Sequence, residues 1–199
     1  MEEILLASAS PRRAELLRRM GVPFSVRPAQ VEEEVSGEPE ACVRALARRK
    51  AEDVAARAGR GRVLAADTLV FLDGKALGKP RDGREAAQML AALSGRAHEV
   101  LTGMCLLDAE TGARWERCDR AVIHFGDLTK EEIEEYVATG EPMDKAGAYA
   151  IQGGCMPYIR EIQGEYTTVV GFPAARFYQE LLKMGVDLQK PEEEEYYEF

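Results

Sequence analysis

The sequence contains few of the residues that build cross-linked or zinc-stabilised proteins. Its 199 residues include four cysteines, which lie far apart and form no CxxC pair: Cys42, Cys105, Cys118 and Cys155. Paired spacing is the usual sign of a zinc site, and disulfide frameworks belong to short secreted chains. We therefore expect reduced thiols, packed in the interior of a cytoplasmic protein.

Histidine is also scarce. The two histidines, His98 and His124, lie in segments whose pattern is typical of strands. No Ser-His-Asp arrangement can be argued from two such residues. We expect each to be a hydrogen-bonded structural residue rather than a catalyst.

Long apolar runs and basic surfaces are missing as well. No uninterrupted apolar run approaches the roughly 18–20 residues that span a bilayer, and the N-terminal stretch MEEILLAS is acidic where a secretory signal is positive. A net charge of −9 argues against a general nucleic-acid binder. We expect neither membrane nor nucleic acid as a partner. The charge is still compatible with a small anionic ligand in a local basic pocket.

What is present suits one globular core. Hydrophobic residues make up 46% and charged residues 31% of the chain. Strand-like and helical segments alternate in the first half, and hairpins dominate the second. This order predicts an α/β fold with a mixed sheet, in two lobes around a cleft. We expect one domain over residues 1–187 and a solvated acidic tail over 188–199.

Periodicity and turn residues give the expected elements. Strands are predicted at 3–7, 24–27, 98–108 and 115–125, and helices from Pro11 to Gly21 and at 39–58, 84–95 and 174–185. Two hairpins are predicted, one through Asp73–Gly74 and one through Gln163–Gly164. Thr129 followed by Glu132 indicates a capping box at the start of a further helix.

Residues 8–13, SASPRR, form the first polar cluster of interest. A turn of small residues that leads into a helix offers backbone N–H groups and a positive dipole end to an anion. The hydroxyls of Ser8 and Ser10 add hydrogen-bond donors, and Arg12 and Arg13 add guanidinium groups suited to phosphate. The alternative is an ordinary helix start with exposed arginines.

Asp67 is the most informative single residue. It lies inside the apolar segment VLAADTLVFL, where a carboxylate is costly unless it is paired, bound to metal or functional. Lys79 follows on a tight GKP turn, without the Walker A pattern of a P-loop. We favour a functional role for Asp67.

Three further groups have functional and ordinary interpretations. Glu32, Glu33 and Glu34 form an acidic loop that suits either solvent or Mg²⁺. Lys50 lies on a charged helix face, which usually only meets solvent. The loop DKAGAYAIQGG combines the Asp144–Lys145 pair with Gln152 among glycines, and a structural turn explains the glycines better than the pair.

In this order, the motifs resemble the Maf family of nucleoside triphosphate pyrophosphatases. The resemblance covers nearly the whole chain and rests on LASASPRR, VEEE, LARRKA, AADTLV, LGKPRD, LSGRAHEV, EPMDKAGAYAIQG and GEYTTVVGFP. It implies a Maf/Ham1-like fold and a homodimer. It also implies hydrolysis between the α- and β-phosphates of a nucleoside triphosphate with a divalent cation, Mg²⁺ or Mn²⁺.

The resemblance also implies roles for individual residues. Asp67 would activate water and, with Glu33, hold the metal, although Glu32 is an alternative to Glu33. Lys50, Lys79 and Arg13 would bind the triphosphate. Other substrate-binding positions would be Ser8, Ser10, Arg12, Thr68, Asp144, Lys145 and Gln152. Arg12, Thr68 and Gln152 match the family members that act on dTTP and UTP rather than on methylated GTP.

Two alternatives remain open. The physiological substrate can be a modified pyrimidine nucleotide, such as 5-methyl-UTP or pseudo-UTP, because it would use the same site. A non-enzymatic regulator of septum formation is the other, and the carboxylates and Lys79 argue against it. One local departure from the family pattern is GCMPYIREI, which places Pro157 at the start of an expected strand.

Overall fold

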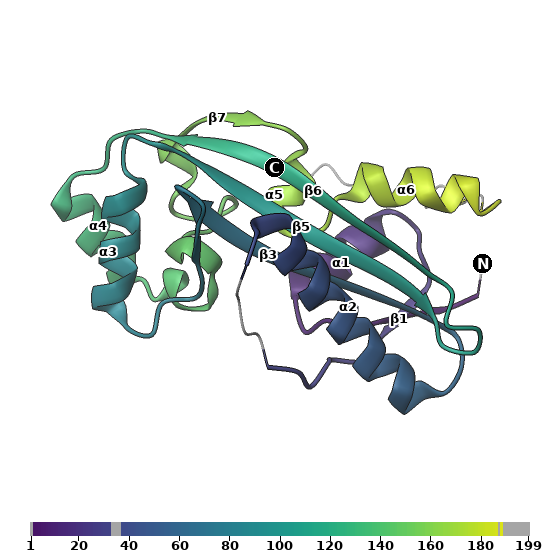
Figure 1. Ribbon diagram of the computed structural model, residues 1–199. Coiled ribbons are helices and arrows are strands. Elements are labelled where there is room, and N and C mark those ends of the chain that lie inside the picture. The colour runs from purple at the N-terminus through teal and green to yellow at the C-terminus, as the bar shows by residue number, and fades with distance from the viewer. Residues whose placement is uncertain (1, 33–36, 187, 189–199) are drawn as a thin grey trace.

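A long, twisted mixed sheet forms the centre of the computed structural model, which describes residues 2–32, 37–186 and 188 (Figure 1). The strand order is β2-β1-β3-β5-β6-β7, and β4 pairs with β3 outside this path. β1 is parallel to β2 and β3, and the other pairs are antiparallel. The strands are β1 (Ile4–Leu6), β2 (Phe24–Val26), β3 (Arg62–Leu72), β4 (Lys75–Leu77), β5 (Ala97–Asp108), β6 (Arg114–Phe125) and β7 (Ile159–Gln163).

Helices cover both faces of the sheet. Figure 1 shows α3 and α4 at one end of the long strands and α1, α2 and α6 nearer the other. The helices are α1 (Pro11–Arg19), α2 (Pro39–Ala58), α3 (Gly83–Leu93), α4 (Lys130–Ala138), α5 (Tyr166–Val170) and α6 (Ala174–Lys183). The expected mixed sheet flanked by helices is confirmed. None of the described helices has the length and apolar character that crossing a membrane requires.

The alternation of side chains along β3 explains how the helices are arranged. Val63 and Ala65 pack against α2 on one face. Leu64 and Ala66 pack on the other face with the core under α1 and α6, and Val70 and Leu72 on that same face join the core under α3 and α4. Successive strand residues point to opposite faces. Thr68 therefore lies between the two cores, and Asp67 points toward α2.

Glycine allows α2 to approach the sheet closely beside Asp67. Gly103 on β5 is the register partner of Asp67. A Cβ atom at Gly103 would lie 2.3 Å from the carbonyl oxygen of Val43 in α2. Since Lys50 follows Val43 by about two helical turns, the same close approach brings Lys50 over Asp67.

Two predicted turn features are confirmed. Asp73 and Gly74 have φ values of 51° and 74°, as a two-residue type I′ hairpin requires, and join β3 to β4. Thr129 accepts a hydrogen bond from the Glu132 N–H, and Glu132 accepts one from the Thr129 N–H, which completes the capping box of α4.

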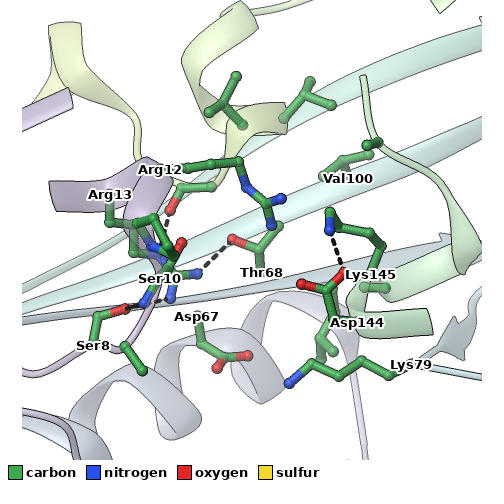
Figure 2. Close-up of a pocket in the computed structure, with 18 of the residues that line it drawn as sticks. Ser8, Ser10, Arg12, Arg13, Asp67, Thr68, Lys79, Val100, Asp144 and Lys145 are labelled. Atoms are coloured by element: carbon green, nitrogen blue, oxygen red, sulfur yellow. Dashed lines mark hydrogen bonds and ion pairs between the residues drawn. The ribbon is translucent and has the colours of Figure 1, made fainter. Parts of the chain in front are cut away.

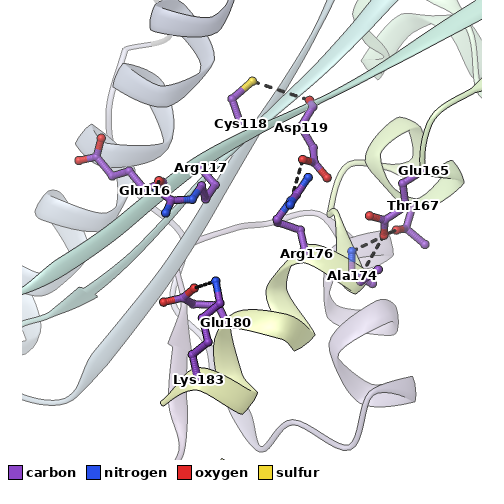
Figure 3. Close-up of polar contacts among 11 residues, drawn as sticks. Glu116, Arg117, Cys118, Asp119, Glu165, Thr167, Ala174, Arg176, Glu180 and Lys183 are labelled. Carbon is purple, nitrogen blue, oxygen red and sulfur yellow. Dashed lines mark hydrogen bonds and ion pairs between the residues drawn. The ribbon is translucent and has the colours of Figure 1, made fainter. Parts of the chain in front are cut away.

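The predicted hairpin through Gln163–Gly164 is wrong. β7 ends at Gln163 against β6, and the β-branched run that follows forms the short helix α5. Polar side chains of this segment hold the start of α6: Thr167 Oγ1 accepts from the Ala174 N–H at 3.0 Å, as Figure 3 shows, and Glu165 accepts from the next N–H of α6. These tertiary contacts override the strand propensity of Thr and Val.

Pro157 does not interrupt β7. It lies in a short 3₁₀ turn, Met156–Tyr158, immediately before the strand. The Gly-rich segment before it contains two further 3₁₀ turns, Glu141–Asp144 and Ala146–Ala148, in place of a regular element. The family's expected strand is therefore kept, because the proline precedes the ladder.

His98 predicts a pH dependence of stability. Burial, with a smaller contribution from His124, lowers the pKa of His98 to about 4 from 6.5. Between these pH values the unfolded chain binds a proton that the folded chain does not. Stability is therefore complete above pH 6.5 and is lost as pH falls, by about 2 kcal/mol at pH 5.

His98→Gln tests this prediction, because glutamine can still bond to the Tyr149 hydroxyl, which lies 2.8 Å from His98 Nε2. Urea unfolding at pH 7 and pH 5 should show a smaller pH-dependent loss in the variant than in the wild type. Equal losses in the two proteins would contradict the prediction.

Candidate active site

A cavity of about 570 Å³ opens along an unpaired stretch of β3. β1 pairs with β3 only as far as Leu64, and β4 pairs with the same edge only from Val70. Among the described residues no strand covers the edge between these points. Side chains from both faces of β3 are accessible at this open edge. Asp67 and Thr68 therefore line one cavity, although they point to opposite faces of the sheet.

The cavity brings together every predicted site residue that the structure describes, except the alternative ligand Glu32. Figure 2 labels all of them but Lys50 and Gln152. These residues come from the β1–α1 turn, α1, α2, β3, the β4–α3 turn and the 3₁₀ segment: Ser8, Ser10, Arg12, Arg13, Lys50, Asp67, Thr68, Lys79, Asp144, Lys145 and Gln152. Glu33 lies outside the described residues, and Glu32 is exposed. The chemical roles of these residues stay predictions.

Asp67 and Lys50 form a buried ion pair on the α2 face. The Lys50 ammonium contacts Asp67 Oδ1, and the side chains are 11% and 7% exposed. A buried carboxylate is costly in the absence of such a partner. The pair therefore places the Asp67 carboxylate at the edge of the cavity. The helical pattern alone indicated a solvent-facing lysine, whereas the family resemblance assigned Lys50 to the triphosphate.

Arg13 connects three elements. Its Nε donates to the Gly171 carbonyl at 2.7 Å, Nη1 donates to Ser8 Oγ at 3.1 Å, and Nη2 donates to Thr68 Oγ1 at 3.0 Å. Gly171 ends α5 with a φ of 114°, which suits glycine. Arg13 thus fixes the start of α1 against β3 and α5.

The turn before α1 lines the cavity at the N-terminus of that helix. Ser8 Oγ accepts from the Ser10 N–H at 3.1 Å, and Pro11 occupies the first helical turn, where no N–H is needed. The first turn of α1 carries no acidic side chain. The helix N-terminus is therefore suited to an anion.

Across the cavity, Asp144 and Lys145 form a second ion pair (Figure 2). The hydrogen bond from Lys145 holds the pKa of the Asp144 carboxyl below its usual range, and Arg12 adds to this effect. The loop is anchored by the Gly147 N–H, which donates to the Gly78 carbonyl at 3.1 Å. The Asp144 carboxylate is therefore ionised at neutral pH.

Sequence reasoning missed one residue that completes the polar network. Thr102 on β5 is fully buried and is the register partner of Thr68. Its hydroxyl lies 2.9 Å from Thr68 Oγ1 and donates to the Thr168 carbonyl at 2.8 Å. The signal was available, because Thr102 is a polar residue inside the apolar run VLTGMCLL, as Asp67 is in its own strand.

The charges of the lining define the class of site. Five cationic side chains and two carboxylates face the cavity: Arg12, Arg13, Lys50, Lys79 and Lys145, with Asp67 and Asp144. This excess of cations occurs in a chain of net charge −9. A cationic cleft with a helix N-terminus and a buried carboxylate is the site of an α/β protein that binds and processes a phosphorylated small molecule.

Similarity to known proteins identifies the family. The chain belongs to the Maf family, whose model, described as Maf-like protein, matches residues 3–184. A protein named dTTP/UTP pyrophosphatase from Moorella thermoacetica is 47% identical over 190 residues, which are 94% of this chain and 98% of the relative. Proteins of the same name from Desulforamulus reducens and Carboxydothermus hydrogenoformans are 46% and 47% identical, covering 94% and 92% of this chain and 100% and 99% of the relatives.

Proposed function

We propose that this protein hydrolyses dTTP and UTP between the α- and β-phosphates, giving the nucleoside monophosphate and pyrophosphate. The observation that carries the proposal is the buried Asp67–Lys50 pair at the edge of a cationic cavity. Family membership and relatives named dTTP/UTP pyrophosphatase support the same reaction.

We assign the phosphates and the base to different lining residues of the cavity. Lys79, Lys50 and the turn at Ser8 and Ser10 surround Asp67, where the phosphates would lie. Positioning and charge stabilisation are most of what phosphoryl transfer requires of a protein. The pyrimidine would lie toward Thr68, Arg12 and Gln152, which also line the cavity.

Asp67 has the surroundings of a general base. In the proposed step a water oxygen attacks the α-phosphorus and its proton moves to the Asp67 carboxylate. The bond from the α-phosphorus to the bridging oxygen breaks, and pyrophosphate leaves with that oxygen. Lys50 fixes the carboxylate by binding Oδ1, which leaves Oδ2 to accept the proton in the proposed step.

The described residues fit a cation that arrives with the substrate. Among them no group of three His, Cys, Asp or Glu side chains could enclose a metal ion. Mg²⁺ usually binds one or two carboxylates together with substrate phosphates, and Asp67 supplies one such carboxylate in the cavity. Glu33 is the second proposed ligand. Bound there, Mg²⁺ or Mn²⁺ would neutralise phosphate charge.

Pyrophosphate release from a panel of triphosphates with Mg²⁺ or Mn²⁺ tests the proposal. The panel contains dTTP, UTP, 5-methyl-UTP, pseudo-UTP and the purine triphosphates. Turnover of the pyrimidine substrates is expected, whereas binding without turnover of any substrate would favour a non-enzymatic regulator. A homodimer and a cytoplasmic location are also proposals, which sedimentation and cell fractionation would test.

Gln152→Glu tests recognition of the base. Gln152 is exposed in the cavity, and its amide can both donate to and accept from a pyrimidine edge. Glutamate keeps the acceptors and loses the donor, so we expect about a tenfold fall in kcat/KM for UTP and dTTP, mostly through KM. Gln88→Glu, on the exposed surface of α3, is the matched control. An equal loss for every triphosphate would mean that Gln152 is structural.

A further inference from the structure

A chain of hydrogen bonds runs behind the cavity wall from Arg13 to α5. Arg13 Nη2 donates to Thr68 Oγ1, Thr68 and Thr102 share a bond of 2.9 Å, and Thr102 donates to the Thr168 carbonyl at 2.8 Å. Thr102 itself does not line the cavity. We propose that Thr102 is a positioning residue that makes Thr68 a hydrogen-bond acceptor toward the substrate base, and thereby selects bases with an N3–H group.

The direction of donation along this series of hydrogen bonds follows from the groups at its two ends. The guanidinium of Arg13 can only donate, and the carbonyl of Thr168 can only accept. The single hydroxyl proton of Thr102 goes to that carbonyl, so Thr102 must accept from Thr68. Each of the three hydrogen bonds then has one donor and one acceptor. The proton of Thr68 is directed away from the cavity.

This direction limits what Thr68 can offer. Its oxygen receives one bond from Arg13 and gives its proton to Thr102, which leaves one acceptor lone pair for the cavity. Thymine and uracil carry a donor at N3, whereas cytosine carries an acceptor there. The inference rests on the proposed function, because it assigns the preference for dTTP and UTP over CTP to the Thr102–Thr68 pair.

Thr102→Val removes the acceptor that holds the Thr68 proton. Valine has nearly the same shape as threonine, and the Thr168 carbonyl still accepts from the Gly171 N–H at 3.1 Å. The freed Thr68 hydroxyl can then donate to cytosine N3. We expect the ratio of kcat/KM for UTP to that for CTP to fall about tenfold. A general loss of packing would lower both values in parallel and leave their ratio unchanged.

The chain provides two matched controls. Thr102→Ser keeps the hydroxyl, and Thr168→Val keeps the main-chain carbonyl while removing a buried hydroxyl that has no hydrogen-bond partner among the described residues. Both should keep the UTP/CTP ratio within about twofold of the wild type. An unchanged ratio in Thr102→Val, or an equal fall in Thr168→Val, overturns the proposal.

A measurement on the wild type does not depend on how the variants fold. 3-Deaza-UTP has C–H in place of N3–H, so its kcat/KM should be about tenfold below that of UTP. Equal values would overturn the assignment of Thr68 as an acceptor. If the wild type hydrolysed UTP and CTP equally well, this inference would fail while the proposed function stood. If it hydrolysed no pyrimidine triphosphate, the proposed function would fail together with it.

Discussion

Asp67→Asn is expected to lower kcat for UTP by about 10³-fold, because asparagine cannot accept the proton of the attacking water. Asparagine fills the same space and keeps an oxygen near Lys50, so the cavity wall is retained. The loss should therefore appear in kcat more than in KM. Pyrophosphate release under saturating UTP measures it, and circular dichroism establishes that the variant is folded.

Asp73→Asn is the matched control for that experiment. It makes the same chemical change in the same hairpin, at an exposed aspartate that pairs with Arg96 on the surface. Asp73 has a φ of 51°, a conformation that asparagine adopts readily. Its kcat should stay within about twofold of the wild type. If Asp67→Asn kept more than about a tenth of the wild-type kcat, Asp67 would not be the general base.

The central part of the site was predictable because charged residues occur there at positions where the local sequence pattern does not require them. Asp67 interrupts an apolar strand, and the SASPRR turn places two arginines at a helix start. Each break has a local cause that a single segment reveals. The hairpin at Asp73–Gly74 was also predictable from a single segment. The Asp-Gly dipeptide suits the two positive φ values that this turn requires.

Features that depend on contacts between distant segments were not predictable in this way. The partnership of Lys50 with Asp67 requires the close approach of α2 at Gly103, which no property of the α2 sequence indicates. Thr102 stands out in the sequence as a polar residue in an apolar run, but its contact with Thr68 depends on the register of β3 and β5. The α5 helix depends in a similar way on its contacts with the start of α6. Local propensity instead favoured a strand at α5.

Lys50→Met is expected to remove both stability and activity. It leaves the Asp67 carboxylate in a nearly buried position without the ammonium that contacts Oδ1. Breaking a buried pair by removing one partner costs about 3 kcal/mol. Because the carboxylate also loses its fixed orientation, we expect kcat for UTP to fall about 100-fold. Urea unfolding and pyrophosphate release measure the two effects.

Lys79→Met separates the loss of the pair from the loss of a positive charge. Lys79 lines the same cavity but is exposed, so its removal should cost less than about 0.5 kcal/mol of stability. Its effect should be a higher KM, through weaker contact with the triphosphate. If the two lysine variants lost the same stability, the buried pair would not explain the effect of Lys50→Met.

The double variant Lys50→Met/Asp67→Asn completes the cycle. With both charges removed, neither member of the pair leaves a buried charge without its counter-charge. The double variant should therefore be more stable than Lys50→Met alone by about 2 kcal/mol, although it stays inactive. If the loss of stability in the double variant equalled the sum of the losses in the two single variants, the two residues would not be coupled. The double variant should regain stability without regaining turnover. The fold does not need the Asp67 carboxylate, whereas the reaction needs it to accept the proton of water.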